Sequence, residues 1–144
     1  MVNVFYEDTK TLDKTPEFFD LWFGKICHTE GKLLGDVSVV FCSDTYLLEL
    51  NKRHLQHDFF TDIITFDYSE NKTISAEVYI SKDMMIENAK ENSQIPENEC
   101  LRLVSHALFH CMGYKDKSPN EKKTMRLKEE EFISAVSRET KLDV

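Results

Sequence analysis

Two β-branched segments joined by a short polar turn constrain the fold of this chain more than any other feature. The first, DIITFDY, spans residues 62–68, and the second, ISAEVYIS, spans residues 74–81. Val, Ile, Thr and aromatic residues favour strands, and the Ser-Glu-Asn-Lys sequence between the segments is typical of a turn. The pair therefore predicts a β-hairpin, against which the rest of the chain has to pack.

Helical patterns surround this hairpin. Five segments show the apolar spacing or the capping residues of a helix, and they cover residues 16–28, 43–55, 81–92, 97–112 and a last helix from 118 onward. An extended segment, VNVFY, comes first, and Gly31 and Gly35 mark a turn before a buried strand at 37–42. Few clean βαβ units are visible. We therefore predict one α+β layer-type domain over residues 1–144, a small mixed β-sheet packed with about five helices.

Composition narrows the class of protein. Hydrophobic residues make up 41% and charged residues 31% of the 144 residues, as expected for a globular domain. The sequence has no apolar run close to the roughly 18–20 residues that cross a membrane, and its start, MVNVFYEDTK, does not resemble a signal peptide. We therefore expect a cytoplasmic protein without a membrane partner. Its four cysteines are expected to be reduced and mostly buried, and they are Cys27, Cys42, Cys100 and Cys111.

The charge balance argues against nonspecific coating of nucleic acid. Twenty-six acidic and eighteen basic side chains give a net charge of −8, whereas phosphate binding relies on clustered Lys and Arg. A local basic cluster follows the penultimate predicted helix and consists of Lys115, Lys117, Lys122, Lys123, Arg126 and Lys128. Either these cations meet phosphate groups, or they form a solvated helix face balanced by the acidic residues 129–131.

The predicted helix over residues 97–112 carries the residues with the clearest indication of a chemical role. His106 and His110 are four residues apart, so their side chains lie on one helix face and can share a metal ion. Gly113 then allows the backbone to reverse, which can bring the carboxylate of Asp116 beside both imidazoles. Two histidines, a carboxylate and a water complete a tetrahedral zinc site. The alternatives are two partly buried histidines without a metal, and an Asp116 that is a solvated loop charge.

Three motifs resemble the signatures of the YbeY family, metal-dependent endoribonucleases that are also called rRNA maturation factors. HALFHCMGYKD resembles H-G-x-L-H-L-x-G-[YF]-D-H, in which three histidines bind zinc. LNKRHLQHDFFTDIITFDY resembles L-N-x-x-Y-R-x-x-D-x-P-T-D-V-L-S-F-P, and AEVYIS stands at the place of G-D-I-x-I-S. The three motifs occur in the family's order and spacing, and the resemblance covers residues from about 37 to 132.

The resemblance implies a single-strand-specific endoribonuclease that acts in rRNA maturation, notably at the 3′ end of small-subunit rRNA, and in ribosome quality control. The implied partners are rRNA and the small ribosomal subunit, with no DNA partner. The implied cofactor is one Zn²⁺ per chain, bound by His106, His110 and Asp116, with Asp116 in place of the family's third histidine. Either the zinc-bound water attacks the phosphodiester, or the metal polarises a phosphoryl oxygen while the ribose 2′-OH attacks.

Further candidate site residues follow in part from the same resemblance and in part from the basic cluster, to which Lys115 and Lys117 belong. Asp62 matches the family, and it either accepts a hydrogen bond from a ligand histidine or caps the end of a strand. Leu55 stands where the family has an arginine that serves the RNA backbone. The candidate substrate-binding residues are Lys52, Arg53, Lys115 and Lys117.

Two alternative functions stay open at this point. One is a metallohydrolase of another substrate class. Ala107 stands where HExxH metalloproteases have their glutamate base, which speaks against proteolysis. The other alternative is a ribosome-associated binding factor in which the metal is structural.

Overall fold

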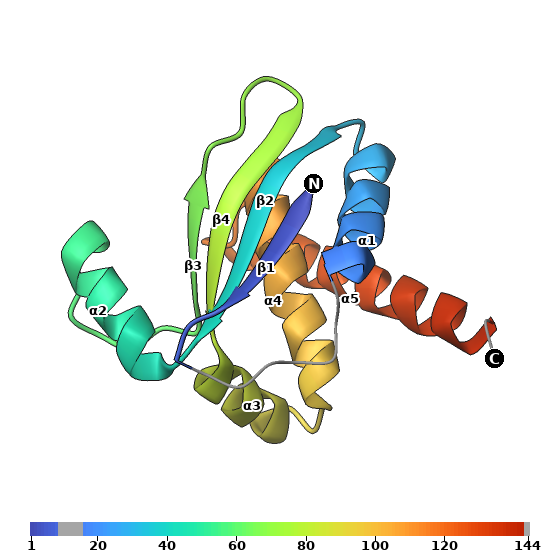
Figure 1. Cartoon of the computed structure of the whole chain (residues 1–144). Helices are drawn as coiled ribbons and strands as arrows, with labels where there is room; N and C mark the ends of the chain where they lie inside the picture. The colour runs from blue at the N-terminus through green and yellow to red at the C-terminus, as the bar shows by residue number, and fades with distance from the viewer. Residues whose placement is uncertain (9–15, 143–144) are drawn as a thin grey trace.

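The computed structural model describes residues 1–8 and 16–142, which form a mixed β-sheet with helices packed around it (Figure 1). In chain order the described elements are β1 (Val2–Tyr6), α1 (Pro16–Thr29), β2 (Leu33–Cys42), α2 (Asp44–Leu55), β3 (Ile63–Asp67), β4 (Thr73–Ser81), α3 (Lys82–Glu91), α4 (Pro96–Cys111) and α5 (Pro119–Leu142). The predicted α+β class is therefore confirmed, and the helix that carries both histidines, α4, is the penultimate one.

The sheet has the strand order β1-β2-β4-β3. β3 pairs antiparallel with β4, with Ile63 opposite Ile80 and Asp67 opposite Ala76, which confirms the predicted hairpin. β1 pairs parallel with β2, and β2 pairs parallel with β4. Parallel strands need a crossover connection, and α1 and α2 lie in these two crossovers. The sheet thus has more βαβ character than the sequence pattern indicated.

The main hydrophobic core lies between one face of the sheet and the helices α1, α4 and α5. Alternate residues of β2 and β4 face this core because strand side chains point to opposite faces in turn. Its fully buried members include Phe19, Phe23, Val37, Val39, Phe41, Ile74, Val78, Ile80 and Leu108. A smaller core under α2 consists of Cys42, Leu47, Leu50 and Ile64. Helix α4 is therefore held firmly, which makes it a rigid support for side chains at its end.

The helix starts follow the capping residues of the sequence. Ser43 and Ser81 each accept a hydrogen bond, at 3.1 Å, from the backbone N–H three residues later. Ser118 and Glu121 form a reciprocal capping box, in which the Glu121 N–H donates to Ser118 Oγ at 3.1 Å and the Ser118 N–H donates to Glu121 Oε1 at 2.8 Å. Each cap satisfies backbone donors that the first turn of a helix leaves unpaired.

Strand β2 begins earlier than predicted, at Leu33, because Gly35 lies within the strand and does not end a turn. A Cβ atom at Gly35 would lie 2.3 Å from Ser75 Oγ and 3.0 Å from the backbone oxygen of Ile74. The glycine therefore permits a close approach of β2 to β4, at a register irregularity between Leu34 and Val37. Gly31 does take the left-handed conformation of a turn, with φ +71°.

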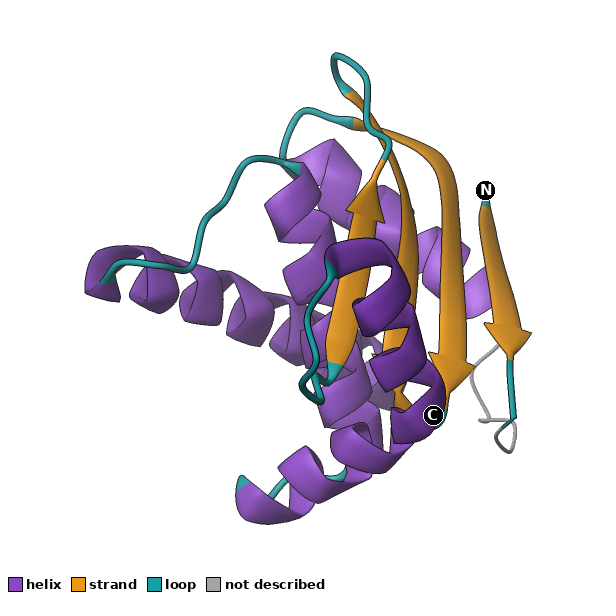
Figure 2. Ribbon diagram, turned by 90° about the vertical axis from the view of Figure 1, so that its left-hand side faces the viewer, coloured by secondary structure: helices purple, strands orange, loops and turns teal. Residues whose placement is uncertain are grey.

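The start of α5 projects beyond the sheet, where a loop joins it to α4 (Figure 2). This loop contains Asp116. Among the described helices, none combines the length and the apolar character that a bilayer crossing requires.

Candidate metal centre

The end of α4 and the loop after it bring three potential ligands together. His106 Nε2 lies 3.2 Å from Asp116 Oδ2, and His110 Nε2 lies 3.5 Å from Asp116 Oδ1. The two imidazole rings are 4.6 Å apart between centroids. Gly113 has the positive φ, +103°, that the predicted backbone reversal requires. The one described group of three or more His, Cys, Asp or Glu side chains with metal-ligand spacing is this trio.

The spacing of these donor atoms allows the three side chains to share one metal ion. Zinc–nitrogen bonds of about 2.0–2.1 Å place neighbouring ligand atoms of a tetrahedron roughly 3.3–3.4 Å apart. The nitrogen–oxygen separations of 3.2 and 3.5 Å lie close to that value, and they end on the two different oxygens of Asp116, Oδ2 toward His106 and Oδ1 toward His110. With one ligand atom from each residue, the three donor atoms lie within 4.8 Å of one another. The donor set, two imidazoles and one carboxylate, is of the kind found in catalytic zinc sites, which leave one position for water or substrate.

Glu129 fixes the orientation of His106. Its Oε2 atom lies 2.7 Å from His106 Nδ1, and the Glu129 residue is only 4% exposed. A proton on Nδ1 therefore donates to Glu129, which leaves the lone pair of Nε2 directed toward Asp116. Burial alone lowers the pKa of His106, but the hydrogen bond and charge of Glu129, with the charges of Asp116 and Asp62, raise it overall. A more basic imidazole is a stronger metal ligand.

Glu129 was not predicted as a site residue, and one of the two alternatives for the basic cluster counted it with residues 130 and 131 on a solvated face. The buried position of Glu129 shows that it does not belong to such a face. Glu129 is four residues after Met125 and three before Phe132, and both of these side chains are buried. Helical spacing thus puts Glu129 in the middle of the apolar stripe of α5. That position was the available signal, because a carboxylate within such a stripe needs a buried partner.

Arg102 connects Glu129 to a second buried carboxylate. Its Nη1 atom lies 3.4 Å from Glu129 Oε1, and its Nε atom donates to Glu99 Oε1 at 3.1 Å. Glu99 is 3% exposed, and burial raises its pKa although the Arg102 guanidinium acts in the opposite direction. A chain of charged side chains therefore runs from Glu99 through Arg102 and Glu129 to His106.

Asp62 lies at the same site without contacting a ligand histidine through a described hydrogen bond. Its Oδ2 atom accepts a hydrogen bond from Asn88 Nδ2 at 3.0 Å, and its backbone oxygen accepts one from the Ser81 N–H at 2.9 Å. The carboxylate that holds His106 is Glu129. Of the two roles considered for Asp62, the observed contacts favour the second, a cap at the strand end where β3 meets β4 and α3.

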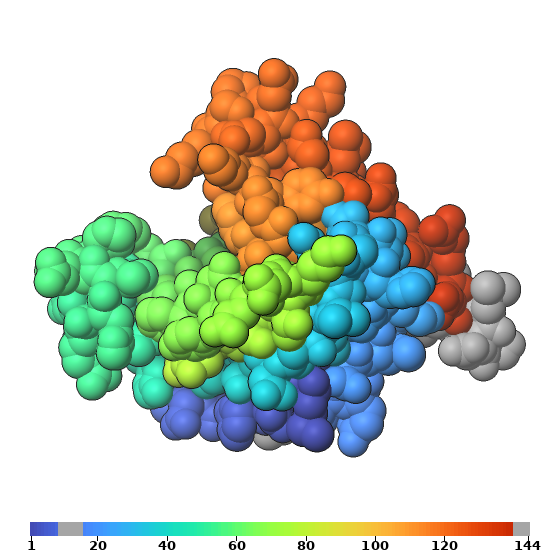
Figure 3. Space-filling model, turned by 90° about the horizontal axis from the view of Figure 1, so that it is seen from above, coloured from blue at the N-terminus to red at the C-terminus, as the bar shows by residue number. Residues whose placement is uncertain are grey.

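A cleft of about 340 Å³ opens beside two of the candidate ligands, His106 and Asp116. Its wall includes Asp62, Arg102, His106, Asp116, Lys122 and Arg126. Figure 3 shows the molecule hollowed between α2, in green, and the start of α5, in orange. Two members of the predicted basic cluster, Lys122 and Arg126, therefore face the candidate metal centre.

The four predicted substrate-binding residues lie outside that wall. Lys115 and Lys117 are exposed on either side of Asp116. Lys52 is paired with Glu49 at 3.6 Å and Asp58 at 3.5 Å, and Arg53 is exposed on α2. Leu55 is 41% exposed at the end of the same helix.

Two exposed phenylalanines, which the sequence analysis did not consider, precede Asp62. Phe59 and Phe60 are 56% and 55% exposed, and the Phe59 ring stacks on His57 at 5.0 Å between centroids. The buried Asn51 side chain donates to the backbone oxygen of Phe59 at 2.9 Å, which anchors the loop. An aromatic surface is thus held at the end of the loop that leads to the cleft.

Substituting Glu129→Gln is expected to weaken zinc binding about 10–100-fold, the usual effect of removing the hydrogen-bond partner of a ligand histidine. The amide is similar in size but loses the charge that raises the pKa of His106. Competition with a chromophoric chelator measures the affinity. Glu130→Gln is the matched control because residue 130 is exposed on the same helix; equal affinities of both variants would contradict the role of Glu129.

Comparisons with known proteins identify the family of the chain. The family model described as Endoribonuclease YbeY matches residues 6–137. A Flavobacterium johnsoniae protein named Endoribonuclease YbeY is 38% identical over 134 residues, which cover 93% of this chain and 96% of the relative. One of the same name from Phocaeicola vulgatus is 38% identical over 116 residues, covering 81% of this chain and 84% of the relative.

A solved structure shares the fold. The solution structure of a Thermotoga maritima protein superposes with a TM-score of 0.70 at 25% sequence identity, and the match covers 99% of this chain and 93% of that protein. With the family model spanning most of the sequence and relatives near 38% identity over most of their own length, this chain belongs to the endoribonuclease YbeY family.

Proposed function

We propose that this chain is a zinc-dependent endoribonuclease that cuts single-stranded RNA in the cytoplasm, in rRNA maturation and ribosome quality control. Its proposed partners are rRNA, notably at the 3′ end of the small-subunit rRNA, and the small ribosomal subunit. The observation that carries the proposal is the spacing of the His106, His110 and Asp116 donor atoms, with His106 and Asp116 in the wall of an open cleft. Family membership supplies the class of reaction.

The chemistry is divided between the ion and the chain. His106, His110 and Asp116 would hold the zinc ion, which would supply a Lewis acid for cleavage of the phosphodiester. Glu129 holds the proton on His106 Nδ1, so that the ring keeps its orientation. Because Asp116 replaces a neutral histidine, the loaded site carries one positive charge fewer. Attraction of the phosphate backbone therefore depends more strongly on Lys122 and Arg126, which line the cleft.

Preference for single strands is supported by the aromatic loop before Asp62. Phe59 and Phe60 present exposed rings, and rings of this kind bind unpaired bases by stacking, which a duplex does not allow. With a net charge of −8, the chain gains little long-range attraction for RNA. Stacking offers affinity that does not depend on net charge, in a chain where Leu55 replaces the arginine of the family motif.

The test uses the full chain after chelator treatment, with and without one equivalent of zinc. We expect about one zinc per chain, cleavage of a single-stranded RNA oligonucleotide only after zinc is restored, and slower cleavage of the same sequence in a duplex. Gel analysis of the products and metal analysis of the protein measure these outcomes. Cleavage that persists without metal, or a protein that takes up no metal under metal-replete conditions, would refute the proposal.

A further inference from the structure

Asp116 differs from the two histidines in how it is held. The histidines lie on α4, whereas Asp116 lies in the loop between α4 and α5, so its position depends on what fixes that loop. On its C-terminal side, the Ser118–Glu121 capping box anchors the start of α5. On its N-terminal side, the nearest anchored side chain is that of Tyr114, two residues away.

Tyr114 is held by one side chain from the turn after α1 and one from α5. Its hydroxyl donates a short hydrogen bond to Oε1 of Glu30, which follows α1. The second oxygen of Glu30 lies 3.5 Å from Lys128 Nζ on α5, and this ammonium also lies 5.6 Å from the centre of the Tyr114 ring. Tyr114, Glu30 and Lys128 therefore each contact the other two, and we call this group the Tyr114 tether.

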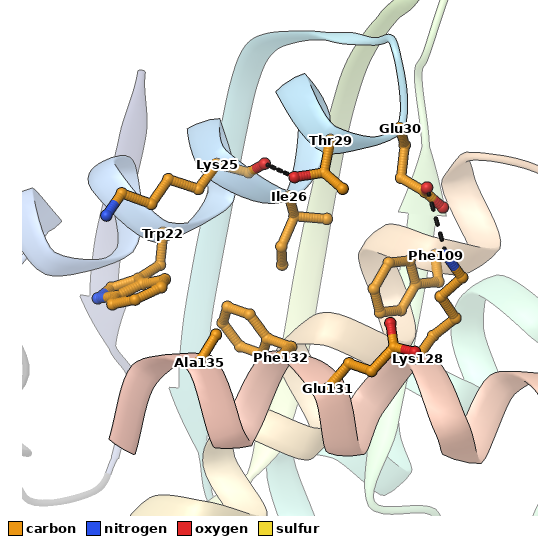
Figure 4. A pocket seen from close by; sticks show the side chains of 10 residues that line it. All are labelled: Trp22, Lys25, Ile26, Thr29, Glu30, Phe109, Lys128, Glu131, Phe132 and Ala135. Carbon is orange, nitrogen blue, oxygen red and sulfur yellow. Dashed lines mark hydrogen bonds and ion pairs between the residues drawn. The ribbon is translucent and has the colours of Figure 1, made fainter. Parts of the chain in front are cut away.

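The surroundings of the Tyr114 tether make these contacts stronger than those of a surface ion pair. The side chains of Glu30 and Lys128 are only 15% and 29% exposed, and partly buried charges are screened less by water and salt. Figure 4 shows Glu30 and Lys128 meeting at the rim of a pocket of about 170 Å³, which Phe109 also lines. The Phe109 ring packs edge-on against Tyr114, with 5.6 Å between centroids. Both ends of the tyrosine side chain are thus fixed.

We propose that Glu30, acting through the Tyr114 hydroxyl, is a positioning residue for the metal ligand Asp116, and that Lys128 completes the Tyr114 tether. This inference rests on the metal centre of the proposed function. Glu30 and Lys128 do not bind the metal themselves. They reduce the number of loop conformations in which Asp116 lies away from the two imidazoles, so that less ordering free energy is lost when the metal binds.

The test compares zinc affinity in the full chain and in variants that break the Tyr114 tether. Tyr114→Phe removes the hydroxyl, and Glu30→Gln removes the charge that Lys128 pairs with. Each is expected to weaken zinc binding about tenfold, as loss of outer contacts at a metal site does, and to broaden the visible absorption bands of the Co²⁺-substituted protein. Lys128→Arg, which keeps the charge, is expected to retain the affinity of the unmodified chain.

Two controls separate positioning from general stability. Lys25→Met breaks a different ion pair, the one between Lys25 of α1 and Glu139 of α5 at 2.8 Å. This pair does not involve the loop. This variant is expected to keep full zinc affinity. In an Asp116→Ala background, Tyr114→Phe is expected to cause no further loss, because the residue that it positions is gone. Thermal melts of the metal-free proteins show that each variant is folded.

The outcomes distinguish this inference from the proposed function. One outcome is that the unmodified chain binds one zinc while the zinc affinities of both Tyr114→Phe and Glu30→Gln stay within twofold of its own. In that case the Tyr114 tether has no positioning role, although the metal centre stands. An additional loss from Tyr114→Phe in the Asp116→Ala background would equally overturn it. If the unmodified chain binds no zinc, the metal centre itself is refuted.

Discussion

Replacing His110 by alanine is expected to reduce RNA cleavage about a thousandfold or more while the fold is retained. The change removes one of the three proposed metal ligands. Metal catalysis contributes several kcal/mol of transition-state stabilisation, and each 1.36 kcal/mol equals a factor of ten in rate. His110 lies at the end of α4 with 36% of its side chain exposed, and it is not part of either hydrophobic core. Initial cleavage rates on single-stranded RNA measure the loss.

The same variant decides between a catalytic and a structural metal. A structural site predicts that metal-free protein unfolds, since metal binding then supplies folding free energy. The extensive core between the sheet and α1, α4 and α5 predicts instead that metal-free protein and His110→Ala melt at the same temperature. His28→Ala is the control, because His28 is exposed at the end of α1. A His110→Ala protein that cleaves RNA within tenfold of the control would contradict a catalytic metal.

The secondary structure was largely accessible from sequence because local signals determine it. Ser43, Ser81 and the Ser118–Glu121 pair cap helices where the sequence indicated, and the β-branched segments pair as a hairpin. The parallel pairing of β1 with β2 was not accessible in the same way. It depends on how α1 packs on the sheet, which is a long-range property. Gly35 shows the same limit, since its role depends on the approach of Ser75 from another strand.

The residues of the candidate site show the same difference between local pattern and tertiary packing. The positions of His106, His110 and Asp116 follow from helical spacing and a glycine turn within eleven residues of sequence. Glu129 comes from the next helix, and its contact with His106 requires that α5 packs across α4. Glu30 is 84 residues from its partner Tyr114. Residues that hold and tune the site were therefore missed where tertiary packing, and not local pattern, brings them together.

Replacing Arg102 by methionine is expected to destabilise the metal-free protein by about 3–5 kcal/mol, the cost of removing one partner from a buried ionic network. Arg102 bridges Glu99 and Glu129, whose side chains are only 4% and 5% exposed. Methionine fills similar volume, so the effect comes from two buried carboxylates that lose their shared cation. Denaturant unfolding in chelator-containing buffer measures the change without the contribution of metal binding.

The controls for this substitution use charge and pH. Arg138→Met, at an exposed position of α5, is expected to change the free energy of unfolding by less than about 0.5 kcal/mol. Adding Glu99→Gln to Arg102→Met is expected to recover part of the loss, since it removes one unpaired charge. A loss of about 3–5 kcal/mol in the Arg138→Met control, or no loss of unfolding free energy in Arg102→Met, would contradict the stabilising role of the buried network.

Lowering the pH tests most directly whether Arg102 stabilises the fold by neutralising buried carboxylates. The pKa of Glu99 is raised in the folded protein, mainly by burial, while Arg102 lowers it, so loss of Arg102 raises it further. The folded state then binds more protons than the unfolded state, and stability falls as pH rises through the folded pKa. The difference in unfolding free energy between Arg102→Met and the unmodified chain is therefore expected to shrink as the pH is lowered from about 7 toward about 5. A difference that stays constant over this range would mean that Arg102 stabilises the fold by packing its aliphatic stem and not by neutralising buried carboxylates.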